Sequence, residues 1–240
     1  MSRKEPRLYF PHDLKQGVSL ALSHDQTHYL MNVMRLGSGD HVRLFCDEHG
    51  EWRAKLDVQG KKKAGVVVLD HLRAPQTRPF LGLAFTPLRP HRLSFLVEKA
   101  VELGVSDLFP VLTKYTAVRH VNEDKLRAAA IEAAEQCERL DVPTLHPLQD
   151  LGQFCGNLTP SQHLYFCHER QEGGLLWDHA GSPPKFPLIL VGPEGGFDAQ
   201  EVTFLKGLPG VTSVSLGQGI LRAETAALAA LSLFHGAPRA

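Results

Sequence analysis

The sequence lacks the features of a membrane protein, a secreted protein or a zinc protein. No stretch approaches the roughly 20 apolar residues of a membrane-spanning helix. The N-terminus leads into no apolar signal segment, so we expect a cytoplasmic protein. The cysteines have no C-x-x-C spacing, which argues against a zinc knuckle and a disulfide framework. We expect reduced thiols at all four positions, Cys46, Cys137, Cys155 and Cys167.

The chain also lacks net charge, because 26 Lys and Arg balance 26 Asp and Glu. This balance hides an asymmetry along the chain. Residues 1–75 hold 12 basic against 9 acidic side chains, a net of +3, whereas residues 76–240 hold 14 against 17, a net of −3. The phosphates of a nucleic-acid partner would therefore meet the N-terminal part first.

Two segments near the C-terminus each have the order strand, glycine-rich turn, helix. Phe186 to Val191 is a short apolar run, typical of a strand buried on both faces of a parallel sheet, and G-P-E-G-G-F follows at 192–197. The second strand is expected over 211–216, with L-G-Q-G-I-L-R-A-E-T-A at 216–226 and an Ala- and Leu-rich helix over 223–234. Two such turns form a crevice at the carboxyl ends of a parallel sheet, the usual ligand site of an open α/β sheet.

The same sheet is expected to receive further strands from upstream. The pattern predicts a strand over 80–85, a helix over 91–103 that ends at Gly104, a strand over 108–112 and a long helix that begins after Asn122. A strand over 163–167 ends in Cys167-His168-Glu169, which would supply a third loop around the crevice.

A dinucleotide-binding fold is the competing interpretation of the second turn. Residues 217–222 fit five positions of G-x-G-x-x-G, a match that is weak by itself. Arg222 occupies the place of the third glycine. Only 18 residues follow it, too few for the returning strand and its acidic ribose ligand. We therefore reject this interpretation.

The N-terminal part has the pattern of a small β-barrel. Short strand-like runs are interrupted by one helix for which Ser23 is a plausible cap. Arg73 to Pro79 contains two prolines and no apolar periodicity, as expected of a linker. The expected domains are residues 1–74 and 75–240, and the expected strands of the first are 7–10, 18–22, 41–46, 51–58 and 65–69.

A zinc site at His24 and His28 is the alternative for this helix, because two histidines four residues apart share a helix face. The metalloprotease pattern requires Glu beside the first histidine, and Asp25 stands there. The sequence supplies no evident third ligand. We favour a solvated helix face and predict no metal.

The two glycine-rich motifs, G-P-E-G-G-F and L-G-x-x-I-L-R-A-E-T-A, resemble the C-terminal signature of the RsmE-type methyltransferases of the SPOUT class. That family transfers a methyl group from S-adenosylmethionine (SAM) to N3 of one uridine in small-subunit (16S) ribosomal RNA. Further matches are Lys99, Glu102, Leu103 and Gly104 on one helix, and E-A-A-E-Q-C-x-R ending at Arg139. Where the family has a Glu-Arg-Ser-like segment, this chain has Lys114-Tyr115-Thr116.

The resemblance implies an α/β fold in which a SPOUT methyltransferase domain with a trefoil knot, 75–240, follows a PUA-like, RNA-binding β-barrel domain, 1–74. It also implies SAM as cofactor, 16S ribosomal RNA, either free or within the small subunit, as partner, and a homodimer. Two other functions stay open. A related enzyme could act on tRNA or on a ribose 2′-hydroxyl, and a non-catalytic RNA-binding module would use the barrel alone.

The chemistry of such a reaction indicates the site residues. SAM needs an apolar cradle and bare main-chain groups, which the strand ends and the glycines of the turns supply. The predicted cofactor-binding residues are Cys167, His168, Leu190, Val191, Gly192, Pro193, Glu194, Gly195, Gly196, Leu216, Gly217, Gly219, Ile220, Leu221, Arg222, Thr225 and Ala226.

Catalysis has a second requirement, because N3 of uridine must lose its proton. This calls for a base, or for a cation that stabilises the anionic ring. Arg222 is the first choice for that cation, and Glu194 and Glu224 are the candidate carboxylates. The predicted RNA contacts are Arg7, His28, Arg35, Arg119 and Arg139.

Overall fold

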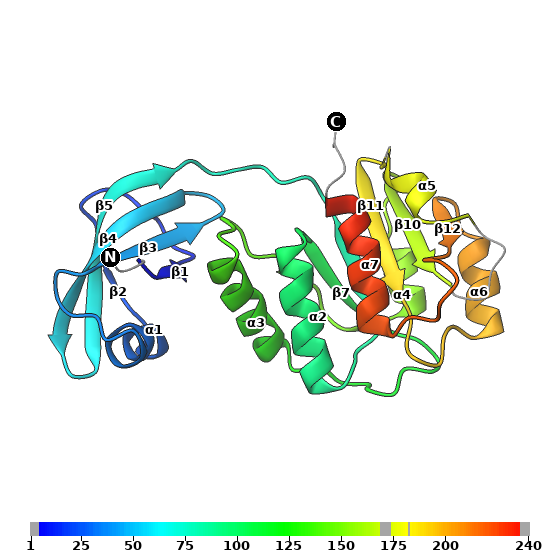
Figure 1. Cartoon of the computed structure of the whole chain (residues 1–240), viewed down its shortest axis with the longest axis horizontal. Coiled ribbons are helices and arrows are strands. Elements are labelled where there is room, and N and C mark those ends of the chain that lie inside the picture. Colours follow the sequence, from blue (N-terminus) through cyan, green and yellow to red (C-terminus); the bar gives the residue numbers. More distant parts are fainter. Residues whose placement is uncertain (1–4, 169–173, 182, 236–240) are drawn as a thin grey trace. The chain divides into compact units, whose positions relative to one another are not determined.

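A computed structural model of the chain describes residues 5–168, 174–181 and 183–235 (Figure 1). They form two compact units. The first comprises residues up to Thr77 together with Ala134–Val142, and the second comprises Arg78–Ala133 and the chain from Pro143 onward. The segment 134–142 thus groups with the first unit, although the sequence pattern places it in the second domain. Glu169 of the expected third loop lies outside the described residues.

The first unit is built on a five-stranded sheet in the order β1-β3-β4-β5-β2. β1 pairs with β3 in parallel and the other neighbours are antiparallel, with β4 and β5 forming a long hairpin. Apolar side chains from all five strands enclose one core that includes Leu8, Leu44 and Val66. Each expected strand of this unit is present, as β1 (Arg7–Tyr9), β2 (Ser19–Ala21), β3 (His41–Cys46), β4 (Gly50–Gly60) and β5 (Lys63–Arg73).

The helix of the first unit begins where the sequence predicts. Ser23 Oγ accepts from the backbone N–H of Gln26, and the Gln26 side chain accepts in return from the Ser23 N–H, a capping box that starts α1 (His24–His28). The helix continues as a π-helical turn, η1 (Tyr29–Val33), which buries Leu30 in the core. This capped, anchored helix leaves the His28 side chain exposed on its outer face.

Arg7 lies in the interior of the first unit. Its Nε donates to Glu51 over 2.6 Å, and its Nη atoms donate to the carbonyls of Ala134, Glu135 and Arg139 over 2.7–3.0 Å. Two of these acceptors, Ala134 and Glu135, lie in the last turn of α3 (Glu123–Gln136), where helix carbonyls lack donors from within the helix. Burial would raise the pKa of Glu51, but hydrogen bonds from Arg73 and Arg7 outweigh it and hold this pKa below its ordinary value.

The second unit is a parallel sheet in the order β12-β10-β11-β6-β7-β8, with β9 also pairing with β7. The strands expected over 80–85, 108–112, 163–167 and 186–191 are present, and the one expected over 211–216 ends earlier. The bounds are β6 (Gly82–Phe85), β7 (Asp107–Leu112), β8 (Thr144–Leu145), β9 (Gln149–Asp150), β10 (Gln162–Cys167), β11 (Phe186–Val191) and β12 (Val211–Val214).

Helices cover this sheet and fix the position of the C-terminal turns. α2 (Pro90–Glu102) buries Leu93, Leu96, Val97 and Ala100, and it ends two residues before Gly104, which has a φ of +88°. α7 (Ala223–His235) packs against α2 and lies over β11 (Figure 1). The remaining helices are α4 (Leu151–Gly156), α5 (Trp177–Ala180) and α6 (Ala199–Lys206). A second core cluster contains Leu164, Phe166, Leu188 and Leu190 of the sheet together with apolar side chains of α4 and α6.

Candidate functional site

Three parallel strands of the second unit end side by side. The register pairs Cys167 of β10 with Val191 of β11 and with Val214 of β12. Parallel strands share their carboxyl edge, so the turns that follow β11 and β12 emerge at the same edge, on either side of the end of β10. The sequence predicts this juxtaposition, and it forms the base of the candidate site.

The first turn brings bare backbone against an aromatic ring. A Cβ built on Gly192 would lie 2.8 Å from Cε2 of Phe197, so a larger residue there would displace the ring. Phe197 also packs edge-on against Phe166, with ring centroids 5.8 Å apart. Asp198 then caps α6 (Ala199–Lys206) in a capping box with Glu201. The turn is therefore held at both ends.

The second turn depends on glycine at one position. Gly217 has a φ of +121°, a conformation that residues with a Cβ rarely adopt. Ser215 Oγ accepts from the Gly217 N–H over 3.2 Å and closes the turn. The Arg222 carbonyl accepts from the Ala226 N–H over 2.8 Å, so Arg222 directly precedes the first hydrogen-bonded turn of α7. The fold thus places a cation at the start of this helix.

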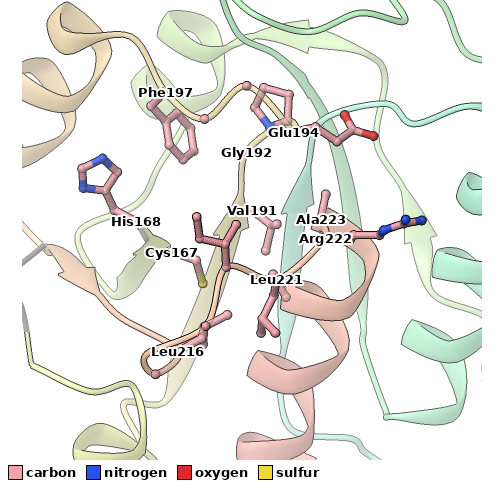
Figure 2. A pocket seen from close by; sticks show the side chains of 17 residues that line it. Cys167, His168, Val191, Gly192, Glu194, Phe197, Leu216, Leu221, Arg222 and Ala223 are labelled. Atoms are coloured by element: carbon pink, nitrogen blue, oxygen red, sulfur yellow. The ribbon is translucent and has the colours of Figure 1, made fainter. Parts of the chain in front are cut away.

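The two turns and the end of β10 enclose a cavity of about 460 Å³. Figure 2 shows Cys167, Val191, Leu216 and Leu221 around its inner part, with Arg222 and Glu194 projecting to the same side of it. The lining consists of Cys167, His168, Val191, Gly192, Pro193, Glu194, Gly195, Gly196, Phe197, Leu216, Gly217, Gly219, Ile220, Leu221, Arg222, Ala223 and Ala226.

Most of the predicted cofactor residues lie in this lining, and two do not. Leu190 points into the second core cluster because side chains alternate along β11, and Thr225 lies on the exposed side of α7. Two lining residues, Phe197 and Ala223, were not predicted. The place of Phe197, directly after two glycines in the first turn, is the signal that could have indicated it.

Cys167 contributes an apolar sulfur to the cavity. Burial raises the pKa of its thiol to about 12, so the group stays protonated at neutral pH. A thiol in this state is a weak nucleophile. The lining therefore has no activated cysteine at this position.

Both candidate carboxylates contact one cation, Arg92, which is not among the residues predicted from the sequence. Arg92 of α2 places Nη1 3.4 Å from Glu194 Oε1 and Nε 3.6 Å from Glu224 Oε1. Glu194 lines the cavity, whereas Glu224 lies behind it in the first turn of α7.

The structure separates the five arginines and histidines that were predicted to contact RNA. His28, Arg35 and Arg119 are exposed, the first two in the first unit and the third between β7 and α3. Arg7 and Arg139 are 6% and 3% exposed. Arg139 donates to Asp141 over 2.6 Å, and Arg7 binds Glu51 and carbonyls. This corrects the prediction for these two, since their donors hold the first unit together.

Within the described part of the chain, no three His, Cys, Asp or Glu side chains gather closely enough to hold a metal ion. The same residues include no helix with the length and apolar character needed to span a bilayer.

Comparison with known families agrees with the two-unit fold and the cavity. Residues 76–235 match the RNA methyltransferase domain family, and residues 22–69 match the RNA methyltransferase PUA domain family. The second unit holds the cavity, and the PUA match covers β3, β4 and most of β5 in the sheet of the first unit. Fold and site therefore define an RNA methyltransferase with a PUA domain.

The relatives narrow this class. A ribosomal RNA small subunit methyltransferase E from Rickettsia conorii is 34% identical over 234 residues, covering 95% of this chain and 94% of the relative. The Bacillus subtilis protein of the same name is 28% identical over 91% and 90% of the two chains. This chain belongs to the ribosomal RNA small subunit methyltransferase E family.

Solved structures agree over the whole fold. The enzyme of that name from Neisseria gonorrhoeae, solved with S-adenosylmethionine bound, superposes with a TM-score of 0.85 at 28% identity, covering 95% of each chain. A methyltransferase from Legionella pneumophila in complex with SAM gives a TM-score of 0.86 at 28% identity, covering 97% of each chain.

Proposed function

We propose that this protein transfers the methyl group of SAM to N3 of one uridine in 16S ribosomal RNA. The observation that carries the proposal is the cavity between the two glycine turns, at the carboxyl edge of a parallel sheet. Its lining contains the two motifs on which the resemblance depends. The names of the relatives support ribosomal RNA as substrate, and two solved relatives contain SAM.

The residues of the cavity fit this cofactor. A volume of about 460 Å³ lies within the range of roughly 300–1,000 Å³ of small-molecule sites. Val191, Leu216 and Leu221 offer an apolar wall for an adenine ring, while Gly192 and Gly217 leave main-chain groups uncovered. When bound, SAM would supply a methyl group on a positively charged sulfur. A nucleophile that attacks the methyl carbon in line with the C–S bond takes the methyl group, and the sulfur leaves as a neutral thioether.

Arg222 is proposed to stabilise the uracil ring as its N3 proton leaves. The side chain is exposed and lines the cavity, and the start of α7 fixes the backbone from which it projects. A preorganised cation acts most strongly where negative charge develops. Glu194 is the second candidate, because it lines the cavity. We assign Glu224 a role behind the cavity rather than contact with the uridine.

The first unit is proposed to hold RNA through exposed groups. His28 and Arg35 lie within the segment that matches the PUA domain family, and their side chains are exposed. Arg119 is proposed as a further contact from the second unit. We also propose domain limits of 1–74 and 75–240, a trefoil knot in the second, a cytoplasmic homodimer, and 16S RNA within the small subunit as substrate.

Mapping of the methylated nucleotide tests this function. Ribosomal RNA from cells lacking the protein should lack one N3-methyluridine when analysed by mass spectrometry. Wild-type protein should restore it, and Arg222→Ala protein should not. A missing methyl group on tRNA or on a ribose would instead indicate a related enzyme with another substrate. Titration calorimetry with SAM provides the control, because a non-catalytic RNA-binding module would give no heat.

A further inference from the structure

Arg92 contacts carboxylates from two segments that contribute residues to the cavity lining. Glu194 belongs to the turn after β11, and Glu224 belongs to the first turn of α7. The distances of 3.4 and 3.6 Å exceed the 2.8 Å of the Lys99–Glu102 pair on the same helix. Arg92 therefore acts as an electrostatic tether between two segments.

Burial makes the contact with Glu224 the more important one. The Glu224 side chain is 12% exposed, and its Oε2 atom is buried without a hydrogen-bond partner in the described ranges. Among the described residues, Arg92 is the one cation within 4.0 Å of the Glu224 carboxylate, at its Oε1 atom. A buried carboxylate that loses its cation is strongly destabilised. Glu194, whose side chain is 50% exposed, depends far less on the pair.

We propose that Arg92 is a positioning residue for methyl transfer, which acts by holding Glu224 and thereby the start of α7. Arg222 lies two residues before Glu224, and its carbonyl accepts the first helical hydrogen bond. A shift of this helical turn therefore moves Arg222. The inference rests on the proposed function, because it assigns Arg92 to the reaction that Arg222 serves.

Loss of the tether should slow the chemical step more than it weakens binding. A displacement of about 1 Å at a reacting group can cost on the order of 100-fold in rate. We expect Arg92→Gln to lower the single-turnover rate by about 10- to 100-fold. The Kd for SAM should change by less than about threefold. The apolar wall of the cavity, formed by Val191, Leu216 and Leu221, contains neither Arg92 nor the two carboxylates that it contacts. Arg92→Lys, which keeps the charge, should recover most of the rate.

A double-mutant cycle tests whether Arg92 acts through Glu224. Rates are measured at saturating SAM and RNA for Arg92→Gln, Glu224→Gln and the double variant. Two residues that act as one unit give non-additive losses, so the double variant should be no slower than the slower single variant. Arg89→Gln is the matched control, because Arg89 is exposed at the start of the same helix. It should keep the wild-type rate.

Three outcomes would overturn the tether: a wild-type rate in Arg92→Gln, fully additive losses, or an equal loss in Arg89→Gln. The same cycle measured on Tm requires no activity, and non-additive shifts in Tm are expected there too. This readout separates the two proposals. A wild-type protein that binds SAM but methylates no uridine N3 contradicts the proposed function, whereas additive Tm shifts contradict the tether.

Discussion

Arg7 Nε donates to Glu51 Oε1 over 2.6 Å inside the first unit, where the two side chains are 4% and 1% exposed. Glu51 also accepts from Arg73 over 2.7 Å, and Arg43 Nη1 lies 3.8 Å from Glu51 Oε2, so one buried carboxylate faces three guanidinium groups. Arg7 in turn donates to the carbonyl of Arg139. A charge network of this kind ties segment 134–142 to the sheet of the unit to which it belongs.

The first prediction concerns stability. Arg7→Ala should lower the free energy of unfolding by roughly 3 kcal/mol, at the low end for breaking a buried ion pair because Arg73 still neutralises Glu51. Urea denaturation measures the loss. Lys15→Ala is the control, since the Lys15–Asp13 pair is exposed and its removal should change little. Normal stability with lost RNA affinity would instead restore Arg7 as an RNA contact.

The same network predicts a dependence of stability on pH. Hydrogen bonds from Arg73 and Arg7 outweigh burial and hold the pKa of Glu51 below its ordinary value of 4.5. A lowered carboxylate pKa contributes stability that is present above pH 4.5 and is lost as the pH falls through the lower, folded-state pKa. The stability advantage of wild type over Glu51→Gln should therefore shrink as the pH falls below about 4.5. An advantage that stays constant over this range would contradict the assignment.

Local pattern predicts elements and turns well in this chain, and it predicts partners poorly. The strands, the two glycine turns and the caps at Ser23 and Asp198 follow from residues close in sequence. Arg92 and Glu194 are 102 residues apart, and only the packing of α2 against α7 and the sheet brings them together. Nothing local distinguishes the buried guanidinium of Arg7 from the exposed one of Arg35.

Substitution of two cavity glycines by alanine tests whether the cavity has room for a Cβ at each position. A Cβ on Gly192 would lie 2.8 Å from the Phe197 ring, so Gly192→Ala should displace the ring, cost about 1–3 kcal/mol of stability and weaken SAM binding. A Cβ on Gly219 meets nothing within 4 Å, so Gly219→Ala should keep the wild-type Tm. Thermal unfolding and calorimetry compare the two variants. Equal Tm values would show that the ring adjusts without cost.

The charge of Arg222 should matter for the chemical step and little for binding. Removal of one preorganised group that stabilises developing negative charge costs about 100- to 1,000-fold in kcat, so we expect a loss of that size for Arg222→Ala. The Kd for SAM and the KM for RNA should stay close to wild type, because the apolar wall and the first unit remain intact. Arg222→Lys should recover part of the rate by keeping a cation at the start of α7. Near-normal kcat in Arg222→Ala, with both binding constants unchanged, would remove Arg222 from catalysis and leave Glu194 as the first candidate.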